Sequence, residues 1–304
     1  MKILFFPLIR QDNIYTTYVS DYLTDSLFHG LRTLLGNDVV DLYKMWHLYD
    51  DADPELIKGL EGESFATYGL LVDSEDIDRE NIQDKVINSY YDYIIVSIHH
   101  TVNGNYPVIE SALETFRNYY PKDKLIFIDG WDEPALSERV AKECVYFKKE
   151  MLAKYKNLVQ PISLSIPEEK IQNPLKKTLD FAPSDILHEK ISDSYRKSFF
   201  AHTSKAKGWD RMRHYEILAC GCVPFFDDLE RCPDYTLRRF PVKMCSEIKN
   251  LSGVHLEESE KQGYIDFDKF ETTLYNDINE KLISYTKKHL TTVGTAKNFL
   301  SRVA

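Results

Sequence analysis

The strongest constraint on the fold of this chain is a repeated alternation of short apolar runs with longer stretches of helical spacing. Residues 2–8 form an apolar run typical of a buried strand. Leucines at helical spacing follow from Leu23 to Leu35, and the pattern ends near Gly36. A second strand is predicted at 38–43. This strand–helix–strand unit favours a parallel sheet with helices on its faces.

The same alternation continues to about residue 154. Apolar runs at 91–98 and 124–128 predict two more strands, and residues 107–118 are expected to be helical. At least one further helix is expected within 135–154. A stretch with four prolines and little periodicity follows. The first half is therefore predicted to be one α/β domain.

The second half has an α/β rhythm of its own. Helices are predicted at 185–198 and 210–220, with strands at 199–203 and 222–226. Residues 266–304 are expected to be mostly helical. A chain of 304 residues is long enough for two domains of about 150 residues each. We therefore predict domains at 1–154 and 155–304.

Charge and composition exclude several classes of protein. The formal net charge is −10, which argues against nucleic-acid binding because that function needs a basic surface. No apolar run is long enough to span a membrane, and the N-terminal run is too short for a signal peptide. The five cysteines fit no paired zinc spacing and are interpreted as reduced. We expect a cytoplasmic protein without an integral membrane segment.

A lysine-rich loop leads into the helix predicted to begin near Asp210, a plausible N-cap. The first turn of a helix attracts anions, because its backbone N–H groups are unpaired and its dipole is positive there. Gly208 would let a ligand approach the backbone closely. Lys205, Lys207 and Arg213 would add positive charge facing a diphosphate. The pattern predicts an anion site.

Glu216 lies one turn beyond Arg213 on the same helix face. A carboxylate there could accept hydrogen bonds from two ribose hydroxyls, so that one loop and one helix would hold a nucleotide. The alternative is an ordinary surface ion pair between Arg213 and Glu216. In the same way, Lys205 and Lys207 could be solvated loop charges. Spacing alone leaves these alternatives open.

Residues 213–224, Arg-His-Tyr-Glu-Ile-Leu-Ala-Cys-Gly-Cys-Val-Pro, resemble the donor-binding signature of GT-B glycosyltransferases. Together with a Ser-Lys-x-x-Gly loop at 204–208, they are most similar to the exostosin-type and CgeB/YkvP-like groups. Less specific similarity lies at 127–134 and 145–150. The resemblance implies two Rossmann-like domains that face each other across a cleft. It also implies an N-terminal acceptor domain and a C-terminal domain that binds a nucleotide-sugar donor.

The resemblance implies that Arg213 contacts the diphosphate of the donor and that Glu216 contacts its ribose. The full set of predicted donor-binding residues is Ser204, Lys205, Lys207, Gly208, Asp210, Arg211, Arg213 and Glu216. One position departs from the family pattern. Many retaining members carry an acid eight residues before the equivalent of Glu216, and here that position is Gly208. The departure favours inversion over retention.

An inverting transfer needs a base that deprotonates the acceptor hydroxyl. Ligands of open α/β sheets bind beyond the carboxyl ends of the strands, where two pairs of candidates lie. His99 and His100 follow one predicted strand, and Asp129 and Asp132 follow the next. The alternatives are a packed and a solvated histidine for the first pair, and turn and helix-capping roles for the second.

Arg10 and Asp12 follow the first predicted strand and are candidates for acceptor binding. The predicted partners are a nucleotide sugar and a glycan or other hydroxyl acceptor. No metal or other cofactor is expected, because basic groups and a helix N-terminus stabilise the departing diphosphate in this fold type. A non-catalytic module that binds nucleotide sugars or glycans is the alternative. A nicotinamide-dependent oxidoreductase is disfavoured, because the first strand is not followed by G-x-G-x-x-G.

Overall fold

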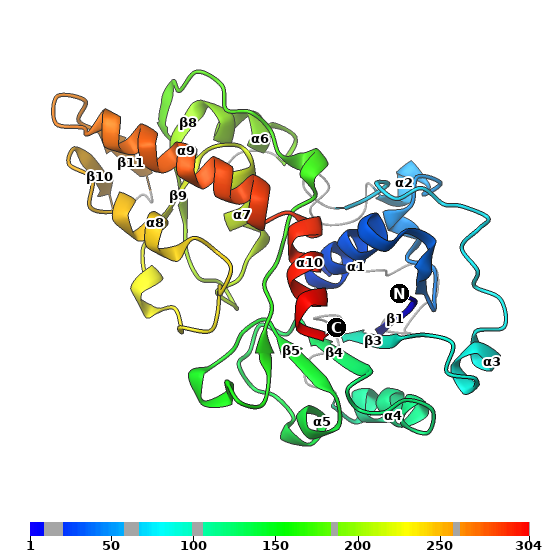
Figure 1. Ribbon diagram of the computed structural model, residues 1–304. Coiled ribbons are helices and arrows are strands. Elements are labelled where there is room, and N and C mark those ends of the chain that lie inside the picture. Colours follow the sequence, from blue (N-terminus) through cyan, green and yellow to red (C-terminus); the bar gives the residue numbers. More distant parts are fainter. Residues whose placement is uncertain (9–20, 58–66, 99–105, 184–187, 258–261, 304) are drawn as a thin grey trace.

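The protein is a two-lobed α/β structure. The computed structural model describes residues 1–8, 21–57, 67–98, 106–183, 188–257 and 262–303. A six-stranded sheet organises one lobe, and a smaller three-stranded sheet organises the other (Figure 1). The α/β class predicted from the sequence is confirmed, and both sheets are compatible with Rossmann-like domains.

The first sheet is parallel throughout. Its strands are β1 (Ile3–Leu8), β2 (Val39–Asp41), β3 (Tyr93–Ile98), β4 (Leu125–Asp129), β5 (Val145–Lys148) and β6 (Gln160–Pro161). They lie in the order β2-β1-β3-β4-β5-β6. Every described side chain of β4 is buried, as expected for an inner strand of a parallel sheet that is covered on both faces.

The helices that follow these strands are α1 (Tyr22–Leu35), α2 (Pro54–Ile57), α3 (Ile82–Ile87), α4 (Tyr106–Arg117) and α5 (Glu138–Glu143). The side chain of Asp21 caps α1 by accepting hydrogen bonds from the backbone N–H groups of Leu23 and Thr24. At its other end Gly36 takes a φ of 60°, which stops the helix at low steric cost. The helix therefore ends at the glycine that the sequence indicated.

The second sheet consists of β7 (Leu179–Phe181), β8 (Ser198–Thr203) and β9 (Val223–Phe226), which are parallel and lie in that order. Helices α6 (His188–Lys197) and α7 (Met212–Ala219) connect them. Beyond β9 follow α8 (Val242–Ile248), the antiparallel hairpin of β10 (Val254–Glu257) and β11 (Gln262–Ile265), and α9 (Thr272–His289). A cluster of aromatic rings around Phe200 fills the core of this lobe.

The last helix, α10 (Thr292–Val303), lies beside α1 rather than on the second sheet (Figure 1). The two helices approach so closely at Gly30 that a Cβ there would meet the carbonyl oxygen of Thr292 at 2.2 Å. Phe299 of α10 packs on Phe147 of β5, with ring centroids 4.9 Å apart. Although the sequence divides most simply near residue 155, β6 and α10 both join the first sheet's lobe.

Each of the twelve segments predicted from the sequence contains an element of the same type among the described residues. The elements that the sequence did not predict are short. Strand β5 has four residues and β7 three, and both lie beside segments with stronger signals. Such short strands carry too few residues for a period of two to be recognised. Yet the two residues directly after β5, Lys149 and Glu150, carry the charged side chains that connect the two lobes.

Candidate functional site

The loop after β8 leads into α7, as the sequence predicted, but the helix begins differently. Its N-cap is Arg211, whose side chain makes no capping hydrogen bond. The Asp210 carboxylate instead accepts hydrogen bonds from the backbone N–H of Leu164 (3.1 Å) and from the hydroxyl of Tyr215 (2.8 Å). The predicted capping role of Asp210 is therefore wrong. With 2% of its surface exposed, the residue holds the loop from inside rather than facing a ligand.

The carboxyl group of Asp210 is buried close to other charged groups. Burial raises the pKa of its carboxyl to about 7, and nearby Glu150 acts in the same direction. Lys149 and the Tyr215 hydroxyl oppose this shift without cancelling it. A carboxyl group of this kind exchanges its proton near neutral pH, because the cost of a buried charge offsets the gain from its partners.

Arg213 and Glu216 are half-buried and do not form the ion pair that their spacing allows. Within the described residues, the Glu216 carboxylate makes no hydrogen bond, and the buried Nε of Arg213 has no partner. Burial raises the pKa of Glu216 to about 7, although Arg213 and Arg211 act to lower it. Buried polar groups are normally satisfied, so the buried Nε of Arg213, without a partner among the described residues and beside the Glu216 carboxylate, indicates a place where another molecule supplies the partner.

The Tyr195 hydroxyl, contributed by α6, is a further unpartnered group beside this pair. Tyr195 is 1% exposed, and among the residues that the structure describes its buried hydroxyl oxygen has no hydrogen-bond partner. Burial raises its pKa, which Arg213 lowers and Glu216 raises, so all three side chains share one electrostatic environment. Sequence reasoning did not single out Tyr195.

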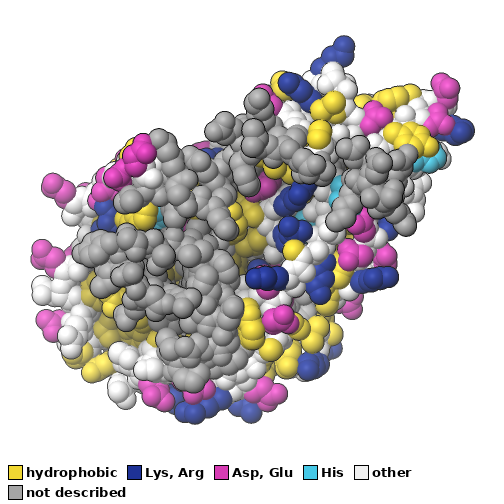
Figure 2. Space-filling model, turned by 180° about the vertical axis from the view of Figure 1, so that it is seen from behind, with side chains coloured by type: hydrophobic (Ala, Val, Ile, Leu, Met, Phe, Trp, Pro, Cys, Tyr) yellow, Lys and Arg dark blue, Asp and Glu magenta, His cyan; other side chains and the backbone are white. Residues whose placement is uncertain are grey.

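The basic side chains of the loop are placed differently from one another. Lys205 and Lys207 are exposed, and the Nζ of Lys205 lies 5.7 Å from the ring centroid of Trp209. Arg211 turns back and donates to the carbonyl oxygen of Ser204 at 2.8 Å. Figure 2 shows Lys and Arg side chains gathered where the two lobes meet, on the face turned away from Figure 1. The loop thus offers positive charge to an anion.

The carboxyl ends of β4 and β5 supply the first lobe's side of this region. Asp129, a candidate base, is 2% exposed and accepts hydrogen bonds from the hydroxyl of Tyr146 and from the Nζ of Lys148 (3.1 Å). It also accepts one from the backbone N–H of Trp131 at 2.9 Å. Three donors and an exposure of 2% hold this carboxylate inside the structure. Asp129 holds the strand ends together.

Asp132 and Glu150 extend from the first lobe to Gly208 in the second. The Nζ of Lys149 pairs with Asp132 at 2.6 Å, and Glu150 accepts a hydrogen bond from the backbone N–H of Asp210 at 2.8 Å. A Cβ on Gly208 would lie 2.6 Å from Oε1 of Glu150 and 2.8 Å from Oδ1 of Asp132. Gly208 is therefore packed against two carboxylates from the other lobe.

Four of the predicted site residues lie outside the part of the chain that the structure describes. His99 and His100, the second pair of candidate bases, lie outside the described residues, and so do the acceptor candidates Arg10 and Asp12. Of the four candidate bases, the structure describes Asp129 and Asp132. Only Asp132 is partly open to solvent, with 29% of its side chain exposed.

Several residues that organise the site were not predicted. His214 is buried, and one of its nitrogens lies 2.9 Å from Oγ1 of Thr203. Its other nitrogen lies 2.8 Å from the carbonyl oxygen of Trp209. Burial lowers the pKa of His214 to about 3, so the ring is neutral and Nε2–H donates to that carbonyl.

Lys149 and Glu150 could have been predicted from the sequence as site residues. Charged residues directly after an apolar strand lie at the sheet edge where ligands bind.

The acidic residue at the end of β2 bears on the nicotinamide alternative. In dinucleotide-binding folds such a residue holds the ribose of the cofactor. Here Asp41 is fully buried and accepts hydrogen bonds from the backbone N–H of Met45, the hydroxyl of Tyr49 and the guanidinium of Arg79. These partners leave no position for a ribose, which adds to the argument against an oxidoreductase.

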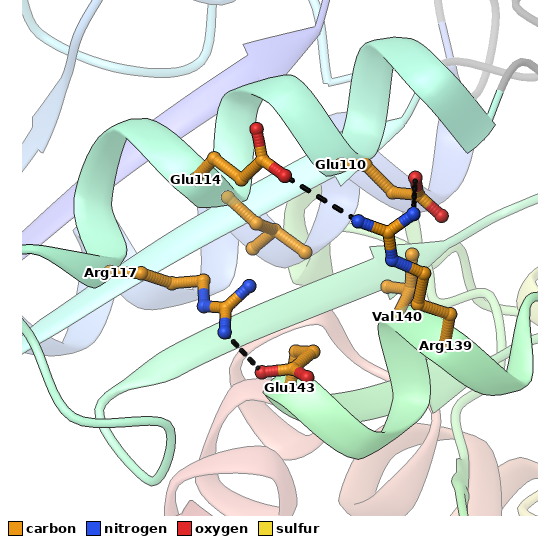
Figure 3. A pocket seen from close by; sticks show the side chains of 7 residues that line it. Glu110, Glu114, Arg117, Arg139, Val140 and Glu143 are labelled. Carbon is orange, nitrogen blue, oxygen red and sulfur yellow. Dashed lines mark ion pairs between the residues drawn. The ribbon is translucent and has the colours of Figure 1, made fainter.

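A small pocket between α4 and α5 lies away from this region (Figure 3). Its charged side chains neutralise one another: Arg139 pairs with Glu110 (3.2 Å) and Glu114 (3.6 Å), and Arg117 pairs with Glu143 (2.7 Å). Every charge that lines it already faces an opposite charge. We interpret it as a surface ion-pair network rather than a binding site.

Replacing Arg139 with alanine is expected to change the free energy of unfolding by less than about 1 kcal/mol, because its side chain is 68% exposed and water screens its two ion pairs. Urea unfolding at two salt concentrations measures this effect. A loss well above that value, insensitive to salt, would contradict the interpretation as a solvated network.

Within the described residues, no group of three or more His, Cys, Asp and Glu side chains is placed to hold a metal ion. None of the described helices combines the length and apolarity needed to cross a bilayer. No protein-family model matches the sequence, and no curated protein matches it significantly. The functional argument therefore depends on the residues and their geometry.

Proposed function

We propose that this protein is a glycosyltransferase that transfers a sugar from a nucleotide-sugar donor to a hydroxyl of a glycan or small-molecule acceptor. In this proposal the two lobes are Rossmann-like domains of a GT-B enzyme. The donor binds to the second lobe at the start of α7, and the acceptor approaches from the first. The reaction proceeds without a metal ion and inverts the sugar.

The observation that supports the proposal is a pair of opposite charges on α7, Arg213 and Glu216, that do not pair with each other. Arg213 and Glu216 are half-buried and adjacent on the helix, yet within the described residues neither is ion-paired. A diphosphate would satisfy the guanidinium, and two vicinal hydroxyls of a ribose would satisfy the carboxylate. Lys205 and Lys207 would add charge to the same diphosphate. A surface ion pair, the alternative interpretation of this spacing, would satisfy both groups internally.

The proposed general base is Asp132. Its carboxylate lies at the junction of the lobes, since Oδ1 approaches Gly208 and the side chain remains partly exposed. Asp132 also acts on one basic group of the second lobe, Arg211. Burial lowers the pKa of Arg211, and the charge of Arg213 lowers it further, whereas Glu216 and Asp132 act to raise it. A base there would face a donor bound on α7. Lys149, whose Nζ lies 2.6 Å from Oδ1 of Asp132, would hold the carboxylate in place.

A thermal-shift and hydrolysis screen tests the proposal. The protein is mixed in turn with UDP-, GDP-, ADP- and dTDP-sugars, and NAD is included as the ligand of the competing class. We expect one nucleotide sugar to raise the melting temperature and to be slowly hydrolysed, because water replaces the missing acceptor. The free nucleoside diphosphate should stabilise the protein as well, since the proposed contacts are made to ribose and diphosphate.

Three outcomes separate the alternatives. Binding together with turnover supports an enzyme, and a slower reaction for Asp132→Asn with an unchanged donor affinity would assign the base. Binding without turnover in the presence of varied acceptors would favour a non-catalytic nucleotide-sugar module. Stabilisation by NAD alone would contradict the proposal.

A further inference from the structure

We propose that Glu150, at the end of β5, is a positioning residue that holds the loop at 204–211 of the second lobe in its binding conformation, so that the first lobe completes the donor site. This inference rests on the proposed function for the identity of the ligand. The positioning itself is a property of the free protein and can be measured without any ligand.

Glu150 contacts the end of the loop, where the chain enters α7. One carboxylate oxygen accepts the backbone N–H of Asp210 at 2.8 Å, one residue before the N-cap of α7. The same oxygen lies 2.6 Å from the place of a Cβ on Gly208. A Cβ at 208 would force this oxygen to move, so the present position of the carboxylate depends on the glycine. The loop is thereby held by a hydrogen bond at 210 and packed against the same oxygen at 208.

The neighbours of Glu150 keep this contact in place. The next residue, Met151, is hydrogen-bonded to Thr236 of the second lobe. Its N–H donates to Thr236 Oγ1 at 3.0 Å, and the Thr236 hydroxyl donates to its carbonyl oxygen at 3.1 Å. Lys149 is buried between acids from both lobes: burial acts to lower its pKa, but Asp132 and Asp210 outweigh this and raise it. One cation thus balances carboxylates from the two lobes.

The contact has a consequence for ligand binding. The residues that Glu150 holds lie between the exposed lysines of the loop and the first turn of α7, which carries Arg213. A loop fixed before the ligand arrives loses less conformational entropy on binding. Removing the carboxylate should therefore weaken binding of a diphosphate even though Glu150 does not touch it. The amide oxygen of glutamine can accept the same backbone N–H, so Glu150→Gln should retain most of the effect.

Hydrogen exchange measured by mass spectrometry on the full-length protein tests the positioning directly. We expect the peptide that covers residues 204–211 to exchange faster in Glu150→Ala, by about tenfold at the amide of Asp210, because that amide loses its acceptor. Glu150→Gln should stay close to the wild type. Glu133→Ala, which removes an exposed acid next to Asp132, is the matched control and should change nothing. Peptides from β8 and β9 should be unaffected in every variant.

Calorimetric titration with the nucleoside diphosphate that stabilises the wild type provides the second measurement. Its Kd should rise about tenfold in Glu150→Ala and by less than about threefold in Glu150→Gln. If Glu150→Ala does not fold, Gly208→Ala tests the same contact from the opposite side, since its new Cβ would clash with Glu150.

The results distinguish this inference from the proposed function. Wild-type exchange of 204–211 in Glu150→Ala would overturn the positioning role whether or not nucleotides bind. Faster exchange throughout β8 and β9 would also overturn it, because it would show a general loss of stability. Faster exchange confined to the loop, in a protein that binds no nucleotide, would support the positioning role and refute the proposed function.

Discussion

Glu216→Ala is expected to raise the Kd for the nucleotide-sugar donor by roughly a hundredfold or more. Two hydrogen bonds from ribose hydroxyls to a carboxylate contribute about 1.5–3 kcal/mol each, and every 1.4 kcal/mol is a factor of ten. Glu216→Gln should show a smaller loss of about tenfold, since its amide oxygen can still accept a hydrogen bond. Calorimetric titration measures both. Transfer or hydrolysis should decrease in parallel at donor concentrations below saturation.

The same substitution should leave the protein at least as stable as the wild type. Burial raises the pKa of Glu216 to about 7, so at pH 8 the folded protein carries an ionised carboxylate that it accommodates poorly. Alanine removes that cost. A residue kept for function commonly shows this combination of lost binding and preserved stability.

Glu280→Ala on α9, which removes an exposed glutamate, is the matched control and should alter neither property. A Glu216→Ala protein with unchanged donor affinity would contradict the assigned role. A protein that loses affinity only because it unfolds would indicate a structural carboxylate instead.

Asp210→Asn is expected to change how stability depends on pH. Burial raises the pKa of Asp210 to about 7 in the folded protein, against about 3.9 in an unfolded chain. The folded state thus holds a proton that the unfolded state releases. The stability contributed by this proton is complete below about pH 4 and is lost as the pH rises through about 7. The wild type should lose up to about 1.4 kcal/mol per pH unit in that window relative to Asp210→Asn.

Urea unfolding at half-unit steps from pH 4 to pH 8 measures this difference. Because Glu150 and Glu216 also have raised pKa values, the wild-type curve alone does not isolate Asp210, and the difference between the two proteins is the informative quantity. Asp234→Asn, at an exposed position, is the control. A difference between the wild type and Asp210→Asn that stays constant across the window would show that Asp210 is ionised throughout.

The elements with strong local signals could be predicted from the sequence. The helix after β1 has an aspartate cap, leucines at helical spacing and a glycine stop, and α1 follows that pattern to its last residue, Leu35. Strands β3 and β4 are long enough for their apolar runs to be recognised. The order of strands and helices then implies parallel sheets, because each crossover carries a helix.

The candidate donor-binding residues could also be predicted from the sequence, because they lie close together along the chain. Arg213 and Glu216 are three residues apart, so helical periodicity alone places them on one face. Whether they pair with each other or remain free depends on rotamers and on neighbours from α6, which spacing does not reveal. The structure leaves both without partners in the described residues, and this turns an ambiguous motif into a candidate site.

The roles of Asp210 and Gly208 were decided by tertiary structure. Local sequence favours Asp210 as a helix cap, but its side chain bonds Leu164 and Tyr215 instead, because burying it satisfies a loop from another part of the chain. Gly208 was assigned to ligand approach, and its open side is filled by Glu150 and Asp132. Leu164, Glu150 and Asp132 lie between about 45 and 76 positions away along the chain from the residues that they contact.

The sequence by itself determined the α/β class, most of the principal strands and helices, and the segment that carries the candidate donor site. These depend on periodicity, caps and turns, which act over a few residues. Only the tertiary structure decided that β5 delivers Lys149 and Glu150 to the second lobe and that α10 returns to the first. Contacts between distant segments arise when whole lobes pack together, and their burial and charge balance have no signature in local sequence.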